Sequence, residues 1–361
     1  MQLLKKIMHF KTITPDNSKC QNVIAYYFKK IGFQRFSFKE KGVKNTLLIR
    51  YSKRPKTTIQ LAFLGHTDTV NANKQEWCCN PYKLTLKDKK LIGRGICDMK
   101  GAIFAIFIAI RVIIKKTLKH NVAIILTGDE EGQADYGTQA IVKKIAHRFK
   151  IKTCIIGEPT SENKIGDVIK TGRRGSCNIK ITIKGKHRHI AYVKHKFSHY
   201  KILQALLKCI AYYKAHIWNI TTDNRLANIT PKYITIYINI RYRTVKILNS
   251  LLTSLQSLIA HTKYYQVTYQ ILSTAHPFKT NKAAKLARIL QTYTQAQIQN
   301  NHGGTSDGRF IAPISKYIVE LGLINKTIHS KNENISIKAL FKLITIYVNS
   351  IYLYLNNIII S

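Results

Sequence analysis

Hydrophobic and polar positions divide the first half of the chain into alternating helices and strands. Apolar residues recur with a helical period between Asn17 and Lys30, which predicts an amphipathic helix that Gly32 terminates. Apolar runs predict strands at 46–51, 58–64, 121–127 and 153–156, and helices at 101–115 and 137–149. This alternation is typical of an α/β sheet with some parallel pairing.

The pattern changes near Arg173. Strict alternation then predicts half-exposed antiparallel strands at 178–183 and 232–241, and a further strand is expected at 267–272. Helical patterns at 200–214 and 247–260 separate these strands. After Pro277 helices and strands alternate again, and a long helix begins near Ile337. We therefore expect an α/β fold in which a discontinuous domain at residues 1–174 and 275–361 carries a mixed sheet flanked by helices, with an α+β domain inserted at residues 175–274.

The charge of the chain is strongly one-sided. It has 59 Lys and Arg against 17 Asp and Glu, a formal net charge of +42. The lysines are spread along nearly every segment, which favours solvated faces over a dedicated nucleic-acid site. Hydrophobic residues make up 45% of the chain, which excludes a mainly disordered protein.

Cysteines and apolar runs indicate the compartment. The seven cysteines form no CxxC pair, which is typical of free thiols in a reducing environment. The N-terminal residues lack the pattern of a signal peptide, and the apolar runs are too short or too interrupted to span a bilayer. We expect a cytoplasmic protein that does not bind membranes.

Because acids are scarce, the places where they occur beside histidines or glycines are informative. The strand at 58–64 leads into LGHTDTV, where His66 is followed by Asp68, a residue placed to accept the second imidazole N–H. The segment GRGICDMKG presents Asp98 in a glycine-rich loop before a helix. Taken alone, the first segment is equally compatible with a surface turn, and the second with a helix-capping aspartate.

Three further acids and a second histidine follow predicted strands. TGDEEG places Glu130 and Glu131 after the strand at 121–127, where like charges repel unless a cation holds them. IIGEP places Glu158 after another strand, and TIH places His329 late in the chain. Together, two histidines and three carboxylates at strand ends fit a site for two metal ions such as Zn²⁺.

The order of the motifs resembles one family. LGHTDTV, GRGICDMKG, LTGDEEG, IGEP, TGRRGS, GGTSDGRFI and NKTIH occur in this order in the dinuclear-zinc aminoacylase/carboxypeptidase family, and the resemblance covers nearly the whole chain. GRRGS and GGTSDGRFI favour its desuccinylase branch over its acetylornithine deacetylase and peptidase branches. The resemblance implies zinc-dependent hydrolysis of N-succinyl-LL-2,6-diaminopimelate to succinate and LL-2,6-diaminopimelate. It also implies that 175–274 is a lid and dimerisation domain.

The resemblance assigns roles to individual residues. It implies two Zn²⁺ per subunit, with Co²⁺ or Mn²⁺ as possible occupants of one site. Asp98 would bridge the ions and Glu130 would be the general base. Asp68 would orient the imidazole of His66. The other metal ligands would be His66 and Glu158 for one ion, and Glu131 and His329 for the second.

The resemblance also implies a set of residues that bind the substrate. His189 looks like the family histidine that reaches across a homodimer to polarise the scissile carbonyl. The positions that would hold the polycarboxylate substrate are Arg173, Ser176, Tyr192, Arg241, Gly304, Thr305 and Asn325. Arginine is suited to this task because its guanidinium pairs with carboxylates in a bidentate way. The family usually shows Gly-His-x-Ala-Tyr-Pro around this histidine, whereas this chain has Arg188 and Val193 at the first and last positions.

Two alternatives remain open at this point. One is a related amidohydrolase, such as an acetylornithine deacetylase or an enzyme of relaxed specificity. The other is a basic nucleic-acid-binding protein built on an inactive hydrolase fold, which would not need to keep acids in a chain this poor in them.

Overall fold

The computed structural model describes residues 1–15, 18–52, 57–114, 120–194, 199–262, 265–280 and 284–356. The chain divides into two compact units. Unit 1 contains residues 1–172, 279–300 and 306–361, and unit 2 contains residues 173–278 and 301–305. The segment expected as an inserted domain, 175–274, falls within unit 2. The short segment 301–305 joins it, and there the Arg173 guanidinium donates a hydrogen bond to the Gly304 carbonyl oxygen at 3.3 Å.

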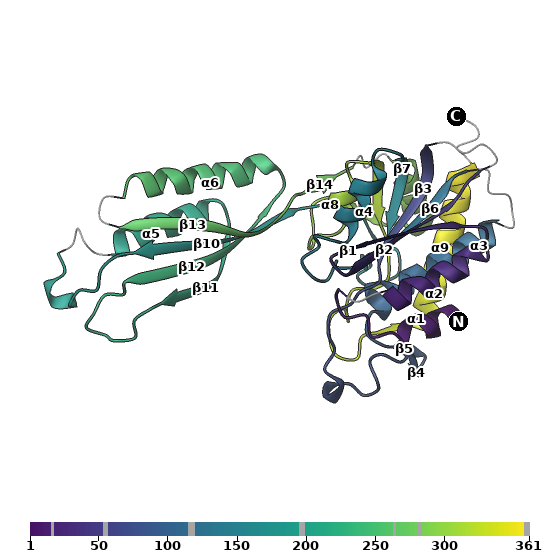
Figure 1. Ribbon diagram of the computed structural model, residues 1–361, viewed down its shortest axis with the longest axis horizontal. Coiled ribbons are helices and arrows are strands. Elements are labelled where there is room, and N and C mark those ends of the chain that lie inside the picture. The colour runs from purple at the N-terminus through teal and green to yellow at the C-terminus, as the bar shows by residue number, and fades with distance from the viewer. Residues whose placement is uncertain are drawn as a thin grey trace. The chain divides into compact units, whose positions relative to one another are not determined.

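Unit 1 is built on a mixed eight-stranded sheet (Figure 1). Its strands, in spatial order, are β1 (Gln34–Glu40), β2 (Val43–Arg50), β6 (Val122–Thr127), β3 (Thr58–His66), β7 (Lys150–Ile156), β16 (Ser315–Glu320), β8 (Val168–Lys170) and β15 (Gln297–Gln299). The four central strands, β6, β3, β7 and β16, run parallel to one another, and β3, β6 and β7 are almost wholly buried. Their carboxyl ends therefore meet at one edge of the sheet.

Helices flank this sheet. They are α1 (Gln2–Met8), α2 (Ser18–Lys29), α3 (Gly101–Ile114), α4 (Thr138–Ile145), α7 (Lys285–Thr294), α8 (Gly308–Ile311) and α9 (Ile337–Asn356). The nearly continuous apolar sequence of α3 is explained by its burial, since it packs against α9 along one side and against Phe28 of α2 through Phe107. Among the described residues, every helix is too short or too polar to cross a membrane.

A small three-stranded sheet joins two distant loops of unit 1. Its strands are β4 (Thr85–Lys87), β5 (Lys90–Ile92) and β17 (Asn334–Ser336), in the order β17-β5-β4. The pairing of β17 with β5 brings the residues after His329 beside the glycine-rich loop that begins at Gly93. A short 3₁₀ helix, η1 (Lys74–Glu76), precedes this sheet.

Unit 2 is an α+β sandwich of one sheet and two helices. The sheet has the order β11 (His216–Thr222), β12 (Tyr233–Tyr242), β10 (Gly175–Lys184) and β13 (Gln266–Ala275), and all its pairs are antiparallel. The alternating isoleucines of β10 and β12 point to one face, where α5 (His199–Tyr212) and α6 (Val245–Ala260) cover them (Figure 1). The strand pair β9 (Gly172–Arg173) and β14 (Phe278–Lys279) marks the points where the chain passes between the units.

Most elements lie where the hydrophobic pattern places them. The end residues Asn17 and Lys115 of two expected helices lie outside the described residues. The helix expected at 137–149 ends earlier, at Ile145. Strand β11 was not expected, because all seven of its residues are exposed and it therefore carries no burial pattern.

Candidate metal centre

The candidate site lies where the parallel strands of unit 1 end. His66 is the last residue of β3, and Glu130 and Glu131 follow the end of β6. Glu158 follows β7, and His329 lies in the segment after β16. Because parallel strands present their carboxyl ends at the same edge of the sheet, side chains from four distant parts of the sequence meet there.

Asp98 reaches the same place from a loop. It lies in the irregular turn η2 (Ile96–Lys100), where its backbone is extended, with φ −120° and ψ 90°, instead of helical. Glycines on both sides permit this turn. Gly95 has a left-handed φ of 83°, and a Cβ on Gly101 would lie 2.3 Å from the Ile96 carbonyl oxygen, closer than any side chain tolerates.

The Asp98 carboxylate lies between two imidazoles. Its Oδ1 is 3.0 Å from Nε2 of His66, and its Oδ2 is 3.4 Å from Nε2 of His329. His66 is buried, whereas the His329 side chain is 47% exposed. One carboxylate thus faces both histidines with different oxygen atoms, which is the arrangement that a bridging ligand needs.

The remaining carboxylates complete two groups of three ligands. His66, Asp98 and Glu158 form one group, and Asp98, Glu131 and His329 form the other, each with its ligand atoms within 4.8 Å of one another. A third combination, of His66 with Glu130 and Glu131, places Glu130 at the side of the cluster. The five residues that the sequence suggests as metal ligands therefore lie together in the structure.

Asp68 contacts both groups. Nδ1 of His66 lies 3.1 Å from the Asp68 backbone oxygen and 3.6 Å from its carboxylate Oδ1. The other carboxylate oxygen, Oδ2, accepts a hydrogen bond from the backbone N–H of Glu131 at 3.1 Å. Asp68 therefore fixes the orientation of a ligand in each group, whereas its expected role concerned only His66.

The first acid of the TGDEEG motif has a structural role. Asp129 has a left-handed φ of 64°, and its carboxylate accepts hydrogen bonds from the backbone N–H groups of Gln133, Asp135 and Tyr136. It thereby folds the loop after β6 back on itself. This leaves Glu130 and Glu131 as the two acids of the motif that reach the cluster.

The crowding of acids and imidazoles changes their pKa values in opposite directions. Burial opposes the charged forms of both Asp98 and His66, but hydrogen bonds outweigh it. Those from His329 and His66 lower the pKa of Asp98, and those to Asp68 and Asp98 raise the pKa of His66 well above its usual value. Hydrogen bonds to Asp98 and Glu131 raise the pKa of His329 to about 10. Burial and the neighbouring Glu158 raise the pKa of Glu130 well above its usual value.

The donor set fits a pair of divalent cations. Imidazole nitrogens and carboxylate oxygens are the ligands of catalytic Zn²⁺ sites. With only protons available, the cluster must protonate its imidazoles and raise the pKa of Glu130 to limit repulsion. Cations between the carboxylates would remove this repulsion directly. The residues present can therefore hold two metal ions that share Asp98.

The expected substrate residues divide between the units. Asn325 lies in unit 1, where its backbone N–H donates a hydrogen bond to the backbone oxygen of Ser161 at 2.9 Å. In unit 2, Ser176 and Arg241 face each other across the pairing of β10 with β12. Also in unit 2 are Arg173, His189, Tyr192, Gly304 and Thr305.

His189 caps the N-terminus of the short helix η3 (Ile190–Tyr192). Its Nδ1 accepts a hydrogen bond from the Ala191 N–H at 3.3 Å, so the neutral ring carries its proton on Nε2. His189 and Tyr192 are both exposed, with ring centroids 5.5 Å apart. The imidazole is thereby oriented to donate a hydrogen bond outward from its free edge.

Sequence reasoning missed three buried polar residues near the cluster. Asp307, in GGTSDGRFI, accepts hydrogen bonds from the hydroxyl groups of Thr138 at 2.6 Å and Thr127 at 3.4 Å. Arg94 and Glu333 form a buried ion pair at 2.9 Å. The scarcity of acids was the one signal that applied to Asp307 and Glu333, because a buried acid in this chain needs a reason.

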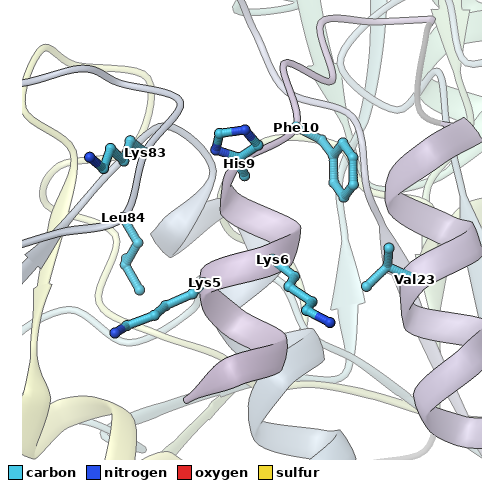
Figure 2. Close-up of a pocket in the computed structure, with 7 residues that line it drawn as sticks. All are labelled: Lys5, Lys6, His9, Phe10, Val23, Lys83 and Leu84. Carbon is cyan, nitrogen blue, oxygen red and sulfur yellow. The ribbon is translucent and has the colours of Figure 1, made fainter.

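A pocket of unit 1 lies away from this cluster. It has a volume of about 430 Å³ and is lined by side chains from α1, the residues just after α1, α2 and the turn before β4, namely Lys5, Lys6, His9, Phe10, Val23, Lys83 and Leu84 (Figure 2). Among the described residues it shares none with the metal-ligand cluster. The cluster is thus defined by its side-chain chemistry and not by the size of a cavity.

Comparison with known proteins agrees with this geometry. The profile of peptidase family M20/M25/M40 matches residues 62–352, a range that includes every residue of the cluster. The chain belongs to this family. A succinyl-diaminopimelate desuccinylase from Wigglesworthia glossinidia brevipalpis is 37% identical over 372 residues, covering 96% of each chain. The family resemblance and the α/β fold expected from the sequence are thereby confirmed.

Solved structures of other proteins share the fold. The aminopeptidase PepT from Bacillus cereus has a TM-score of 0.78 at 18% identity, over 98% of this chain and 97% of its own. A dinuclear metal-binding peptidase of the M20 family from Bacillus subtilis has a TM-score of 0.73 at 11% identity, over 98% of this chain and 97% of its own. At these identities the likeness concerns the fold alone.

We predict that metal binding releases protons. At pH 7.5 the imidazole of His329 is protonated in the metal-free protein, because its pKa is raised to about 10, and a metal ligand must be neutral. Titration of metal-free protein with Zn²⁺ in weak buffer should therefore release protons. The apparent affinity for Zn²⁺ should fall about tenfold for each unit by which the pH is lowered, for each proton displaced.

A matched pair of variants tests the source of these protons. His329→Asn should release fewer protons than the unsubstituted chain, whereas His147→Asn, which changes an exposed histidine after α4, should release the same number. Zn²⁺ binding without proton release in the unsubstituted chain would contradict the assignment.

Proposed function

We propose that this protein is a metal-dependent amidohydrolase that converts N-succinyl-LL-2,6-diaminopimelate and water to succinate and LL-2,6-diaminopimelate. The observation that carries the proposal is the pair of ligand groups that share Asp98. This geometry supports metal-assisted hydrolysis, and the name of the Wigglesworthia relative supplies the substrate. The proposed hydrolysis belongs to the synthesis of lysine and cell-wall precursors.

The proposed cofactor is a pair of Zn²⁺ ions in each subunit, with Co²⁺ or Mn²⁺ as alternative occupants of one site. His66, Asp98 and Glu158 would hold one ion, and Asp98, Glu131 and His329 the other. When bound, such ions polarise the amide carbonyl and make a water molecule more acidic. The protein supplies the placement of these ligands and the groups that move protons.

Glu130 is the proposed general base. It lies beside His66 and Glu131 without belonging to either group around Asp98. Burial is the main cause of its raised pKa, and it gives the Glu130 carboxylate a greater affinity for a proton than an ordinary glutamate has. Glu130 would take a proton from the attacking water and return it to the departing amine nitrogen, so that the carboxylate is regenerated in each turnover.

Residues of unit 2 are proposed to bind the substrate. The outward Nε2–H of His189 suits a donor to the developing oxyanion of the amide carbonyl. Arg173 and Arg241 are permanent cations that suit the several carboxylates of the substrate. Ser176, Tyr192, Gly304 and Thr305, with Asn325 of unit 1, would contact its remaining polar groups.

We infer that the protein is a homodimer in which His189 acts at the active site of the other subunit. The free edge of unit 2 supports this assembly. Strand β11 ends the sheet and exposes Ile217, Trp218 and Ile220 at 38%, 56% and 49%. An exposed edge strand with apolar side chains is a ready surface for pairing with a second copy across a two-fold axis.

The cysteines support a cytoplasmic location. All seven thiols are free, and Cys20, Cys97, Cys154 and Cys177 are buried. Free thiols persist in a reducing compartment. We therefore place the proposed reaction in the cytoplasm, without a specific nucleic-acid or membrane partner.

The first prediction of this proposal concerns Glu130. The unsubstituted protein loaded with Zn²⁺ should release succinate from N-succinyl-LL-2,6-diaminopimelate. Glu130→Gln should lower kcat by about 10²- to 10⁴-fold while metal content stays the same, because the variant loses its proton acceptor and not a ligand. Succinate release and metal content by atomic absorption measure the two effects.

Two comparisons make this result specific. Glu40→Gln changes a half-exposed glutamate on β1 and should keep full activity. Release of acetate from N-acetylornithine without release of succinate from the first substrate would replace the proposed reaction with a deacetylase reaction.

The second prediction concerns the dimer. His189→Ala and Glu130→Gln should each be nearly inactive alone, because each removes one group from every active site. If His189 acts across the interface, mixing the two variants with subunit exchange should restore about a quarter of the original activity, since half of the dimers are mixed and each has one complete site. An active monomer in light scattering, or no recovery in a mixture shown to contain mixed dimers, would refute this assembly.

A further inference from the structure

A buried carboxylate outside the ligand set holds the loop that carries Asp98. Glu333 is fully buried and precedes β17. Its Oε1 accepts hydrogen bonds from the backbone N–H groups of Cys97 at 2.7 Å and Asp98 at 3.2 Å. Its Oε2 accepts one from the Gly95 N–H at 2.9 Å. Three amides of one turn therefore point at a single side chain.

Arg94 extends this contact to the second histidine. Its Nη1 donates to Oε2 of Glu333 at 2.9 Å, and its Nη2 donates to the backbone oxygen of His329 at 3.3 Å. Arg94 is itself buried, and its guanidinium lies over the ring of Trp77, with 5.1 Å from Cζ to the ring centroid. One buried ion pair is thus bonded to the main chain of both Asp98 and His329.

These two ligands need such support because of their backbone. Asp98 lies in an irregular turn, and His329 has a left-handed φ of 58°. A non-glycine residue in that region persists where the surrounding contacts determine its conformation. Glu333 and Arg94 supply contacts of this kind from outside the ligand set.

We propose that Glu333 and Arg94 are positioning residues that set the distance and orientation between Asp98 and His329. They thereby determine the metal affinity of the group formed by Asp98, Glu131 and His329. The group formed by His66, Asp98 and Glu158 depends on them less, because His66 and Glu158 are held at the ends of β3 and β7. This inference rests on the proposed function only in needing a divalent cation at the cluster, not in the identity of the substrate.

The test is Zn²⁺ binding to the metal-free, full-length protein. Glu333→Gln keeps the size of the side chain but replaces one acceptor oxygen with an NH₂ group. This NH₂ group would face N–H donors that bond to the carboxylate in the unsubstituted chain. We expect one of the two Zn²⁺ equivalents to bind about 10- to 100-fold more weakly, the range known for residues that orient metal ligands. Calorimetry measures the two affinities, and the visible spectrum of the Co²⁺-loaded protein reports changed coordination.

A matched control separates positioning from general stability. Asp167 also accepts hydrogen bonds from three backbone N–H groups, those of Glu162, Asn163 and Lys164, in an exposed turn that follows Glu158 in the connection between β7 and β8 but contains no metal ligand itself. Asp167→Asn should bind both equivalents like the unsubstituted chain. If Glu333→Gln does not fold, Arg94→Lys decides the question, because a lysine keeps the charge beside Glu333 but cannot also reach His329.

The outcomes are distinct. Selective weakening of one equivalent in Glu333→Gln or Arg94→Lys, with Asp167→Asn unchanged, supports the proposal. Unchanged affinities in the folded variants, or equal weakening of both equivalents in all three, overturn it. A protein that binds two Zn²⁺ with this pattern but releases no succinate would reject the proposed substrate and leave the positioning role intact.

Discussion

The structure of unit 1 depends on how it holds several carboxylates close together. Asp98, Glu131 and Glu158 meet around two imidazoles, with Glu130 beside them, in a chain that has 17 acids in all. Like charges in a partly buried site repel strongly unless positive charge lies between them. When only protons are available, the raised pKa values of His329 and Glu130 keep protons in the cluster, and these protons reduce the repulsion. The same repulsion makes the cluster a strong site for divalent cations.

The sheet and the loops contribute differently to this site. Parallel strands place His66 and the residues after β6 and β7 with little freedom, because those strands are buried and paired on both sides. Asp98 and His329 come instead from segments without regular backbone, and a buried ion pair between loops far apart in sequence holds them. Asp68 connects the two parts, since it contacts His66 and the backbone of Glu131. The positions of Asp98 and His329 therefore depend on tertiary contacts and not on regular secondary structure.

This division explains what the sequence could and could not predict. The ligands could be found because each follows an apolar strand or lies among glycines, and parallel strands end at one edge. Glu333 could not, because it lies in the polar segment Lys331–Asn334, which is typical of a solvated turn, and its partners are more than 230 residues away. Strand β11 was missed because an exposed edge has no alternation of burial. The pattern of the sequence reports burial by regular elements, and it does not report contacts between loops.

The burial of acids has a consequence for the rest of the molecule. Seven of the 17 acids are buried in the described parts of the chain: Asp68, Asp98, Asp129, Glu158, Asp307, Glu320 and Glu333. Few are left to neutralise a surface that carries most of the 59 lysines and arginines. The folded chain is therefore held together against its own surface repulsion, and dissolved counterions reduce that repulsion over a Debye length of about 8 Å at physiological ionic strength. For this protein, the salt content of its surroundings is part of what keeps the compact state favourable.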